Sequence, residues 1–144
     1  MSAFVLDASY ALMWCFPDRA TANTDAALRR MEAHSDSAVA PWVWQVEVAN
    51  GLGKAVVHGK APLARALEIW EELLLLPIRQ VAIASIPKLL QLAVKQDLSL
   101  YDTCYLQASL VSRLPLATND KKLRAAAESC GITTLCLLYT SRCV

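Results

Sequence analysis

The chain has 144 residues, a length that suits one domain, and we predict a single domain over residues 1–144. Its composition, 56% hydrophobic and 19% charged, excludes a disordered chain and leaves more apolar surface than one core needs. Fourteen Lys and Arg residues against thirteen Asp and Glu residues give a net charge of +1. This balance excludes a strongly basic protein, so any affinity for nucleic acid must be local.

Targeting signals are not expected in this sequence. Residues 1–7 contain no basic residue and place Asp7 beside an apolar stretch, which does not fit a signal peptide. The longest apolar runs, residues 73–76 and 81–86, are far shorter than the ~20 residues of a membrane span. The five Cys residues form no CxxC pair and are odd in number, which favours reduced thiols. We therefore expect a cytoplasmic protein without a membrane segment.

Short apolar segments alternate with helical patterns along the chain. In chain order, the patterns predict strand 3–6, helices 8–16 and 21–34, strand 38–40, helices 42–58 and 62–76, strand 79–84, helices 87–96 and 100–113, strand 116–118, helix 120–129 and strand 132–138. Strands that alternate with helices favour an α/β fold with a largely parallel sheet.

Four of the thirteen acids stand out from the others. Asp7 and Asp120 end predicted strand segments, where ligands bind in open α/β sheets. Glu47 is a lone carboxylate in an apolar helix, and Asp102 begins another apolar helix. Helix capping is an alternative role for Asp102 and Asp120. The remaining acids lie in predicted breaks or on polar helix faces and are expected to be solvated: Asp18, Asp25, Glu32, Asp36, Glu68, Glu71, Glu72, Asp97 and Glu128.

A group of four carboxylates at one end of a sheet needs a counter-charge. Like charges raise one another's pKa, and unpaired buried charges are costly. The only basic residues within these segments are Lys121 and Lys122. A divalent cation would resolve the conflict, because Mg²⁺ and Mn²⁺ prefer carboxylate oxygens. No histidine lies near the four acids in the sequence, which argues against zinc.

The segments that contain these acids resemble the PIN domain, and specifically the VapC-type ribonuclease toxins of prokaryotic toxin–antitoxin pairs. The matching stretches are FVLDAS (4–9), WQVEVAN (44–50), LYDTCYL (100–106) and LATNDKKL (116–123). The resemblance extends in order over nearly the whole chain. It implies a three-layer α/β/α sandwich with a mainly parallel central sheet. One departure is Cys104, where small residues such as alanine are common.

The resemblance also implies an activity and roles for individual residues. In the family, the acids bind one or two Mg²⁺ or Mn²⁺ ions and the enzyme hydrolyses RNA phosphodiester bonds. By position, Asp7 and Asp102 would be the principal ligands, and Glu47 and Asp120 would complete the site. Four polar residues near these acids would support the ligands or contact a phosphate, with capping and turn formation as their alternative role: Ser9, Asn50, Thr118 and Asn119.

RNA must also be held while it is cut. Basic residues in and beside the motifs could contact phosphates, although a solvated surface role is equally open: Lys54, Lys60, Arg65, Lys121 and Lys122. His34 and His58 are not expected to act in catalysis. The family further implies a homodimer and a small antitoxin protein that blocks the site.

Three other functions are compatible with parts of the pattern. A phosphatase of the haloacid-dehalogenase type needs Asp-x-Asp after the first strand, whereas this chain has Asp7-Ala8-Ser9. A receiver-like phosphoacceptor domain needs paired acids there and an Asp after the third strand, which are not visible. A catalytically silent PIN-like module that binds RNA or protein is the third alternative.

Overall fold

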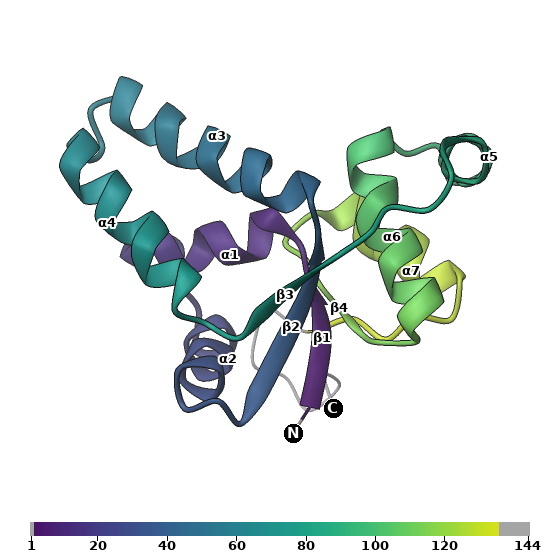
Figure 1. Ribbon diagram of the computed structural model, residues 1–144, viewed down its shortest axis with the longest axis horizontal. Helices are drawn as coiled ribbons and strands as arrows, with labels where there is room; N and C mark the ends of the chain where they lie inside the picture. The colour runs from purple at the N-terminus through teal and green to yellow at the C-terminus, as the bar shows by residue number, and fades with distance from the viewer. Residues whose placement is uncertain (1, 136–144) are drawn as a thin grey trace.

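Four parallel strands form the centre of the molecule, in the order β3-β2-β1-β4 (Figure 1). The computed structural model describes residues 2–135. The strands are β1 (Ser2–Leu6), β2 (Asp36–Pro41), β3 (Ile78–Val81) and β4 (Leu116–Ala117). Since β1 and β4 are parallel neighbours, the residues that follow them emerge at the same end of the sheet.

Helices cover both faces of this sheet. The helices are α1 (Ala8–Cys15), α2 (Ala22–Glu32), α3 (Val43–Val57), α4 (Leu63–Leu74), α5 (Ile86–Gln96), α6 (Leu100–Ser112) and α7 (Lys121–Ser129). Figure 1 shows α1 to α4 on one side of the sheet and α5 to α7 on the other. The predicted three-layer α/β/α fold with a parallel sheet is confirmed. No helix within residues 2–135 is long and apolar enough to cross a membrane.

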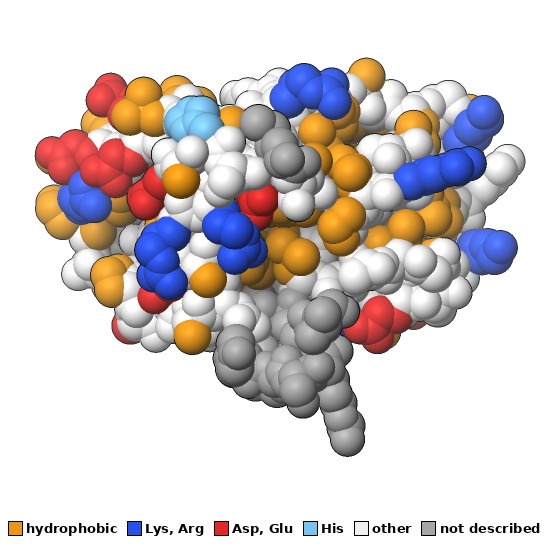
Figure 2. All heavy atoms as spheres, turned by 90° about the horizontal axis from the view of Figure 1, so that it is seen from below, with side chains coloured by type: hydrophobic (Ala, Val, Ile, Leu, Met, Phe, Trp, Pro, Cys, Tyr) orange, Lys and Arg blue, Asp and Glu red, His pale blue; other side chains and the backbone are white. Residues whose placement is uncertain are grey.

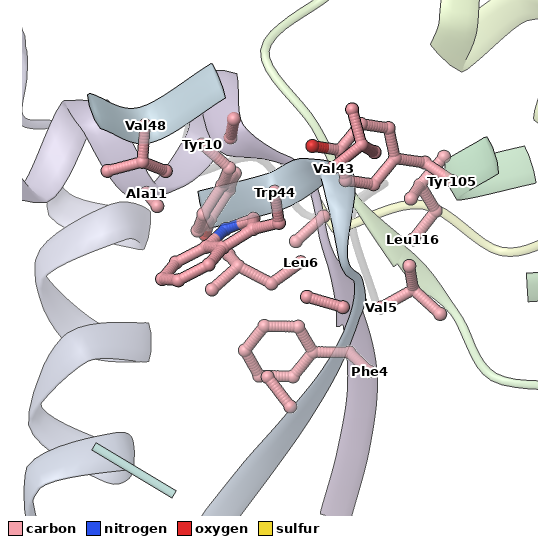
Figure 3. Packing of buried hydrophobic residues seen from close by; sticks show 14 of the residues in the cluster. Phe4, Val5, Leu6, Tyr10, Ala11, Val43, Trp44, Val48, Tyr105 and Leu116 are labelled. Atoms are coloured by element: carbon pink, nitrogen blue, oxygen red, sulfur yellow. The ribbon is translucent and has the colours of Figure 1, made fainter. Parts of the chain in front are cut away.

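Buried side chains hold the carboxyl end of β1 in a fixed position. Val5 and Leu6 are completely buried at the end of β1. In Figure 3, Tyr10 and Trp44 lie on one side of the central strands, and Tyr105 lies on the other. Burial of such large side chains on both faces fixes the strand in register. The backbone that follows Leu6 is therefore held rigidly at the end of the sheet.

Two predicted strands differ from those in the structure. The strand predicted at 79–84 ends at Val81, because its partner Pro41 is the last residue of β2 and the ladder cannot continue. Of the strand predicted at 132–138, the described part forms only an isolated bridge between Thr134 and Leu116. Residues 136–138 lie outside the described residues, as do Cys136 and Cys143.

The helices lie close to their predicted ranges, with one addition. Pro17–Arg19 forms a short 3-10 helix, η1, where only a break was expected. Gly51 in α3 has a packing role, since a Cβ atom there would lie 2.5 Å from a side-chain carbon of Leu12. Glycine thus allows α1 and α3 to approach closely at this point.

The expectation that Asp36 is solvated is wrong. Asp36 is buried at the start of β2, and the Nε of Arg30 donates a hydrogen bond to its Oδ2 at 2.6 Å. A buried carboxylate requires such a partner, and no pattern in the sequence identifies Arg30 as the partner of Asp36. In Figure 2, which views the molecule from below, acidic side chains gather at one edge and basic side chains are scattered among apolar ones. Two of the acids selected from the sequence, Asp7 and Asp120, follow the carboxyl ends of the parallel strands β1 and β4.

Candidate functional site

Asp7 is the buried centre of the candidate site. It directly follows β1 and is only 4% exposed. Two hydroxyl groups donate hydrogen bonds to the same carboxylate oxygen, Oδ2: Ser9 Oγ at 2.6 Å and Thr118 Oγ1 at 2.6 Å. No described residue donates to Oδ1 of Asp7. The carboxylate is thus fixed through one oxygen while the other is available.

The turn after β4 is tied to Asp7 by a hydrogen-bond network. Thr118 Oγ1 also accepts from the backbone N–H of Asp120 at 3.0 Å, and Ser9 Oγ accepts from the backbone N–H of Asn119 at 2.9 Å. A guanidinium nitrogen of Arg124 donates to the Thr118 carbonyl at 2.9 Å. Asp120 caps α7: its Oδ1 accepts a hydrogen bond from the Leu123 N–H at 2.8 Å. The capping role proposed as an alternative is therefore compatible with a position at the site.

Glu47 is held by a residue from the other side of the sheet. The Tyr105 hydroxyl donates a hydrogen bond to Glu47 Oε1 at 2.6 Å, which connects α6 to α3. Tyr105 is completely buried, and Glu47 is half-buried. Burial and the neighbouring carboxylates, Asp7 and Glu47, raise the pKa of the Tyr105 hydroxyl. Tyr105 therefore remains a hydrogen-bond donor and fixes the Glu47 carboxylate.

Three of the four acids, Asp7, Glu47 and Asp102, have a raised pKa to which a neighbouring carboxylate contributes. Burial raises the pKa of Asp7 to about 6, the two hydroxyl hydrogen bonds oppose this, and the charges of Glu47 and Asp102 add to it. Burial, followed by the charge of Asp102, raises the pKa of Glu47, against the lowering effect of Tyr105. Burial and then the charge of Asp120 raise the pKa of Asp102. The structure thus brings Asp7, Glu47, Asp102 and Asp120 together, each from a different motif.

The donor chemistry of this group suits a hard divalent cation. Hydrogen bonds occupy Asp7 Oδ2, Glu47 Oε1 and Asp120 Oδ1, and no described residue donates to the second oxygen of these carboxylates. Within residues 2–135, however, no three His, Cys, Asp or Glu side chains are already spaced as a complete metal site. Mg²⁺ commonly keeps several water ligands and binds through one or two carboxylates, so it does not require a complete protein cage.

The basic residues selected from the sequence do not all approach the acids. Lys54 and Lys60 line a cavity of about 380 Å³ that also contains Glu47 and Asn50. Arg65 instead forms salt bridges with Glu68 and Glu72 on α4 and lines a different cavity. Lys122 pairs with Asp97 at 3.3 Å, and Lys121 is exposed at the start of α7.

Sequence reasoning missed Arg19 and the contact made by Tyr105, and it noted Arg124 only as a basic residue that flanks the last acidic motif. Tyr105 lies in the same motif as Asp102, three positions later, but only the folded structure reveals its contact with Glu47 from the other side of the sheet. Arg124 follows Asp120 by one helical turn, so its position near the loop after β4 could be predicted. Its acceptor, the Thr118 carbonyl, could not. Arg19 lies in the unpredicted η1 helix and lines the cavity next to Glu47.

The chain is similar to known proteins in both sequence and fold. The PIN domain family model matches residues 4–129. Among solved structures, the crystal structure of PAE2754 from Pyrobaculum aerophilum matches with a TM-score of 0.69 at 21% sequence identity. The match covers 90% of this chain and 86% of that one, and at this identity it shows the shared fold alone. No curated protein matches the chain.

Proposed function

The chain belongs to the PIN domain family, which has a nuclease-type fold, and from this we propose that it is a divalent-metal-dependent endoribonuclease. In this proposal, the protein hydrolyses RNA phosphodiester bonds with Asp7, Glu47, Asp102 and Asp120. The observation that carries it is Asp7, which is buried after β1 and is tied through Thr118 to the turn that carries Asp120. The electrostatic effects of Glu47 and Asp102 on Asp7, and of Asp120 on Asp102, support the grouping of the four carboxylates. Family membership sets aside the receiver-like alternative.

The proposed ligands are the carboxylate oxygens without protein donors. Asp7 Oδ1 and the Asp102 carboxylate would hold a Mg²⁺ or Mn²⁺ ion, with Glu47 Oε2 and Asp120 Oδ2 contributing directly or through water. When bound, such an ion neutralises the acids, offsets phosphate charge and acidifies water. Ser9 and Thr118 orient Asp7 through its other oxygen, as supporting hydrogen bonds do around metal sites.

The chain's own carboxylates also provide proton acceptors. Burial raises the pKa of Glu47, so when its second oxygen faces water this carboxylate is a better base than an exposed one. Glu47 is oriented by Tyr105 through Oε1, which leaves Oε2 to accept a proton from an attacking water. Asn50 lies one helical turn after Glu47 on α3 and lines the same cavity, where its amide could contact a phosphate.

The direct test is cleavage of a labelled single-stranded RNA by the purified protein. We expect cleavage with Mg²⁺ or Mn²⁺ and none in EDTA, with activity restored when the metal ion is added back. RNA binding without cleavage in either metal would instead favour the silent PIN-like module, an alternative that the absence of a complete three-ligand site among residues 2–135 makes worth testing.

Tyr105→Phe tests the support of Glu47. Without the hydroxyl, the Glu47 carboxylate loses its only described donor and the pKa of Glu47 rises further. Loss of a residue that orients a ligand typically weakens metal binding by about 10- to 100-fold, so we expect at least a tenfold rise in the Mn²⁺ dissociation constant, measured by calorimetry. Tyr101→Phe is the matched control, because Tyr101 is 61% exposed on the same helix. Equal affinities in the two variants would contradict the assigned role.

The toxin role, with an antitoxin and a homodimer as partners, is a further part of the proposal. Exposed apolar surface supports it. Ile86, Leu90 and Val94 are all more than half exposed and recur every four residues along α5, which places them on one face. An apolar cavity of about 440 Å³ lies between α3 and α4 beside Leu67 and Trp70. Growth arrest of a bacterial host on expression, relieved by the product of a neighbouring small gene, would support this role.

A further inference from the structure

A cluster of basic residues lies beside Glu47, in the cavity of about 380 Å³. Arg19 reaches this cavity from η1, Lys54 from α3, and Lys60 from the turn after α3. His58, at the carboxyl end of α3, also lines it. Basic side chains from three separate segments therefore surround one cavity, whose wall includes the candidate site residue Glu47.

The cations of this cavity have no acidic partner among the described residues. Within residues 2–135, Arg19, Lys54 and Lys60 form no salt bridge, whereas Arg30, Arg65 and Lys122 each have an acidic partner. Arg19 is instead held over the Phe16 ring at 4.7 Å, a contact that orients the guanidinium without neutralising it. The positive charge in the cavity is thus available to an external anion.

The spacing along α3 matches an extended polyanion. Glu47, Asn50, Lys54 and His58 recur at three- and four-residue intervals, so they lie on one face of the helix. The rise from Glu47 to His58 is about 16 Å. A single phosphate would occupy only part of this length, whereas a nucleic acid strand presents a phosphate at each nucleotide.

We propose that this basic groove, defined by Arg19, Lys54, His58 and Lys60, binds the phosphate backbone of single-stranded RNA on one side of the cleaved bond. This inference rests on the proposed function, because it places the strand so that it passes from the four acids along α3. Phosphate contacts of this kind position the strand without reading its bases. The groove therefore supplies affinity that falls with salt concentration.

The experiment measures binding of a fluorescently labelled single-stranded RNA to the wild-type protein in EDTA, which keeps the RNA intact. The double variant Lys54→Gln/Lys60→Gln removes two cations from the groove. We expect its affinity to fall about tenfold or more at low salt, and the slope of log affinity against log salt to decrease by about 1.4, since each single-strand phosphate contact contributes ~0.7. The matched control is Arg29→Gln/Lys95→Gln, in which two exposed cations outside the groove are lost.

Two readouts separate this inference from the proposed function. If both double variants bind RNA like the wild type, or if the wild type does not bind, the groove assignment is overturned. Cleavage of the same RNA by the wild-type protein in Mg²⁺ reports on the proposed function alone. Cleavage together with unchanged binding in Lys54→Gln/Lys60→Gln refutes only the groove, whereas a loss of binding confined to this variant supports it even if no cleavage occurs.

Discussion

Asp102→Asn is expected to reduce metal-dependent RNA cleavage by at least about 100-fold while leaving the fold intact. Loss of a residue that only orients a metal ligand costs about 10- to 100-fold, and removal of a ligand should cost no less. Asp102 is half-buried near the start of α6, and its backbone N–H, which accounts for the helix start, bonds to Ser99 Oγ at 3.1 Å. The substitution keeps this backbone contact and the side-chain volume, so the loss should appear in catalysis rather than in the melting temperature.

Asp97→Asn is the matched control for this experiment. Asp97 lies in the turn before α6, is almost fully exposed, and pairs only with Lys122 on the surface. Its backbone has a positive φ of 52°, a conformation that Asn adopts as readily as Asp. Cleavage by Asp97→Asn should match the wild type. Full activity in Asp102→Asn would remove Asp102 from the site, and equal losses in both variants would point to a general effect of charge.

Asp7→Asn is expected to abolish cleavage and, at the same time, to stabilise the metal-free protein at neutral pH. Burial raises the pKa of Asp7 from 3.8 to about 6, so the ionised carboxylate destabilises the folded state. A shift of this size corresponds to roughly 3 kcal/mol at pH values above 6. Asn removes the charge, and its carbonyl oxygen can still accept hydrogen bonds from the Ser9 and Thr118 hydroxyls. The melting temperature in EDTA should rise by several degrees.

The pH dependence has a definite sign. Because the folded-state pKa of Asp7 lies above its unfolded value, the folded state binds the proton more tightly. The stabilising effect of protonation is complete below pH 3.8 and is lost as the pH rises through about 6. The advantage of Asp7→Asn should therefore be small at pH 4 and reach its maximum above pH 6.

Metal addition provides the complementary measurement for Asp7. Mg²⁺ should raise the melting temperature of the wild type, since a ligand that binds only the folded state stabilises it, and should have little effect on Asp7→Asn. Asp18→Asn, a change in an exposed acid of η1, should behave like the wild type throughout. An Asp7→Asn protein that is less stable than the wild type at pH 7.5 in EDTA would contradict the claim that the buried, ionised Asp7 carboxylate destabilises the folded state.

The sequence predicted those features of the site that depend on strand order. Asp7 and Thr118 follow two apolar segments, and the rule that ligands bind beyond the carboxyl ends of parallel strands places them together. The sequence could not predict the contact between Glu47 and Tyr105, because α3 and α6 lie on opposite sides of the sheet and meet through this hydrogen bond. For the same reason, the sequence predicted only that the grouped carboxylates would raise one another's pKa, and not which carboxylates act on which.

The RNA contact predicted for Arg65 stays a prediction, although Glu68 and Glu72 follow it on the same helical face and form salt bridges with it. Two errors in the sequence interpretation have identifiable physical causes. Asp36 was judged to be solvated because its partner Arg30 belongs to the preceding helix, and only the turn between α2 and β2 brings them together. Arg19 was overlooked because Pro17 signalled a break rather than a short helix.

The most direct test of the account is a crystal of the protein grown or soaked with Mn²⁺, examined at the manganese absorption edge. We predict an anomalous peak within ligand distance of Asp7 and Asp102, with Glu47 and Asp120 in direct or water-bridged contact. The same soak of Asp7→Asn should show no peak at this position. A well-diffracting wild-type crystal with manganese bound elsewhere, and none among these four carboxylates, would contradict the proposal that they form a metal site.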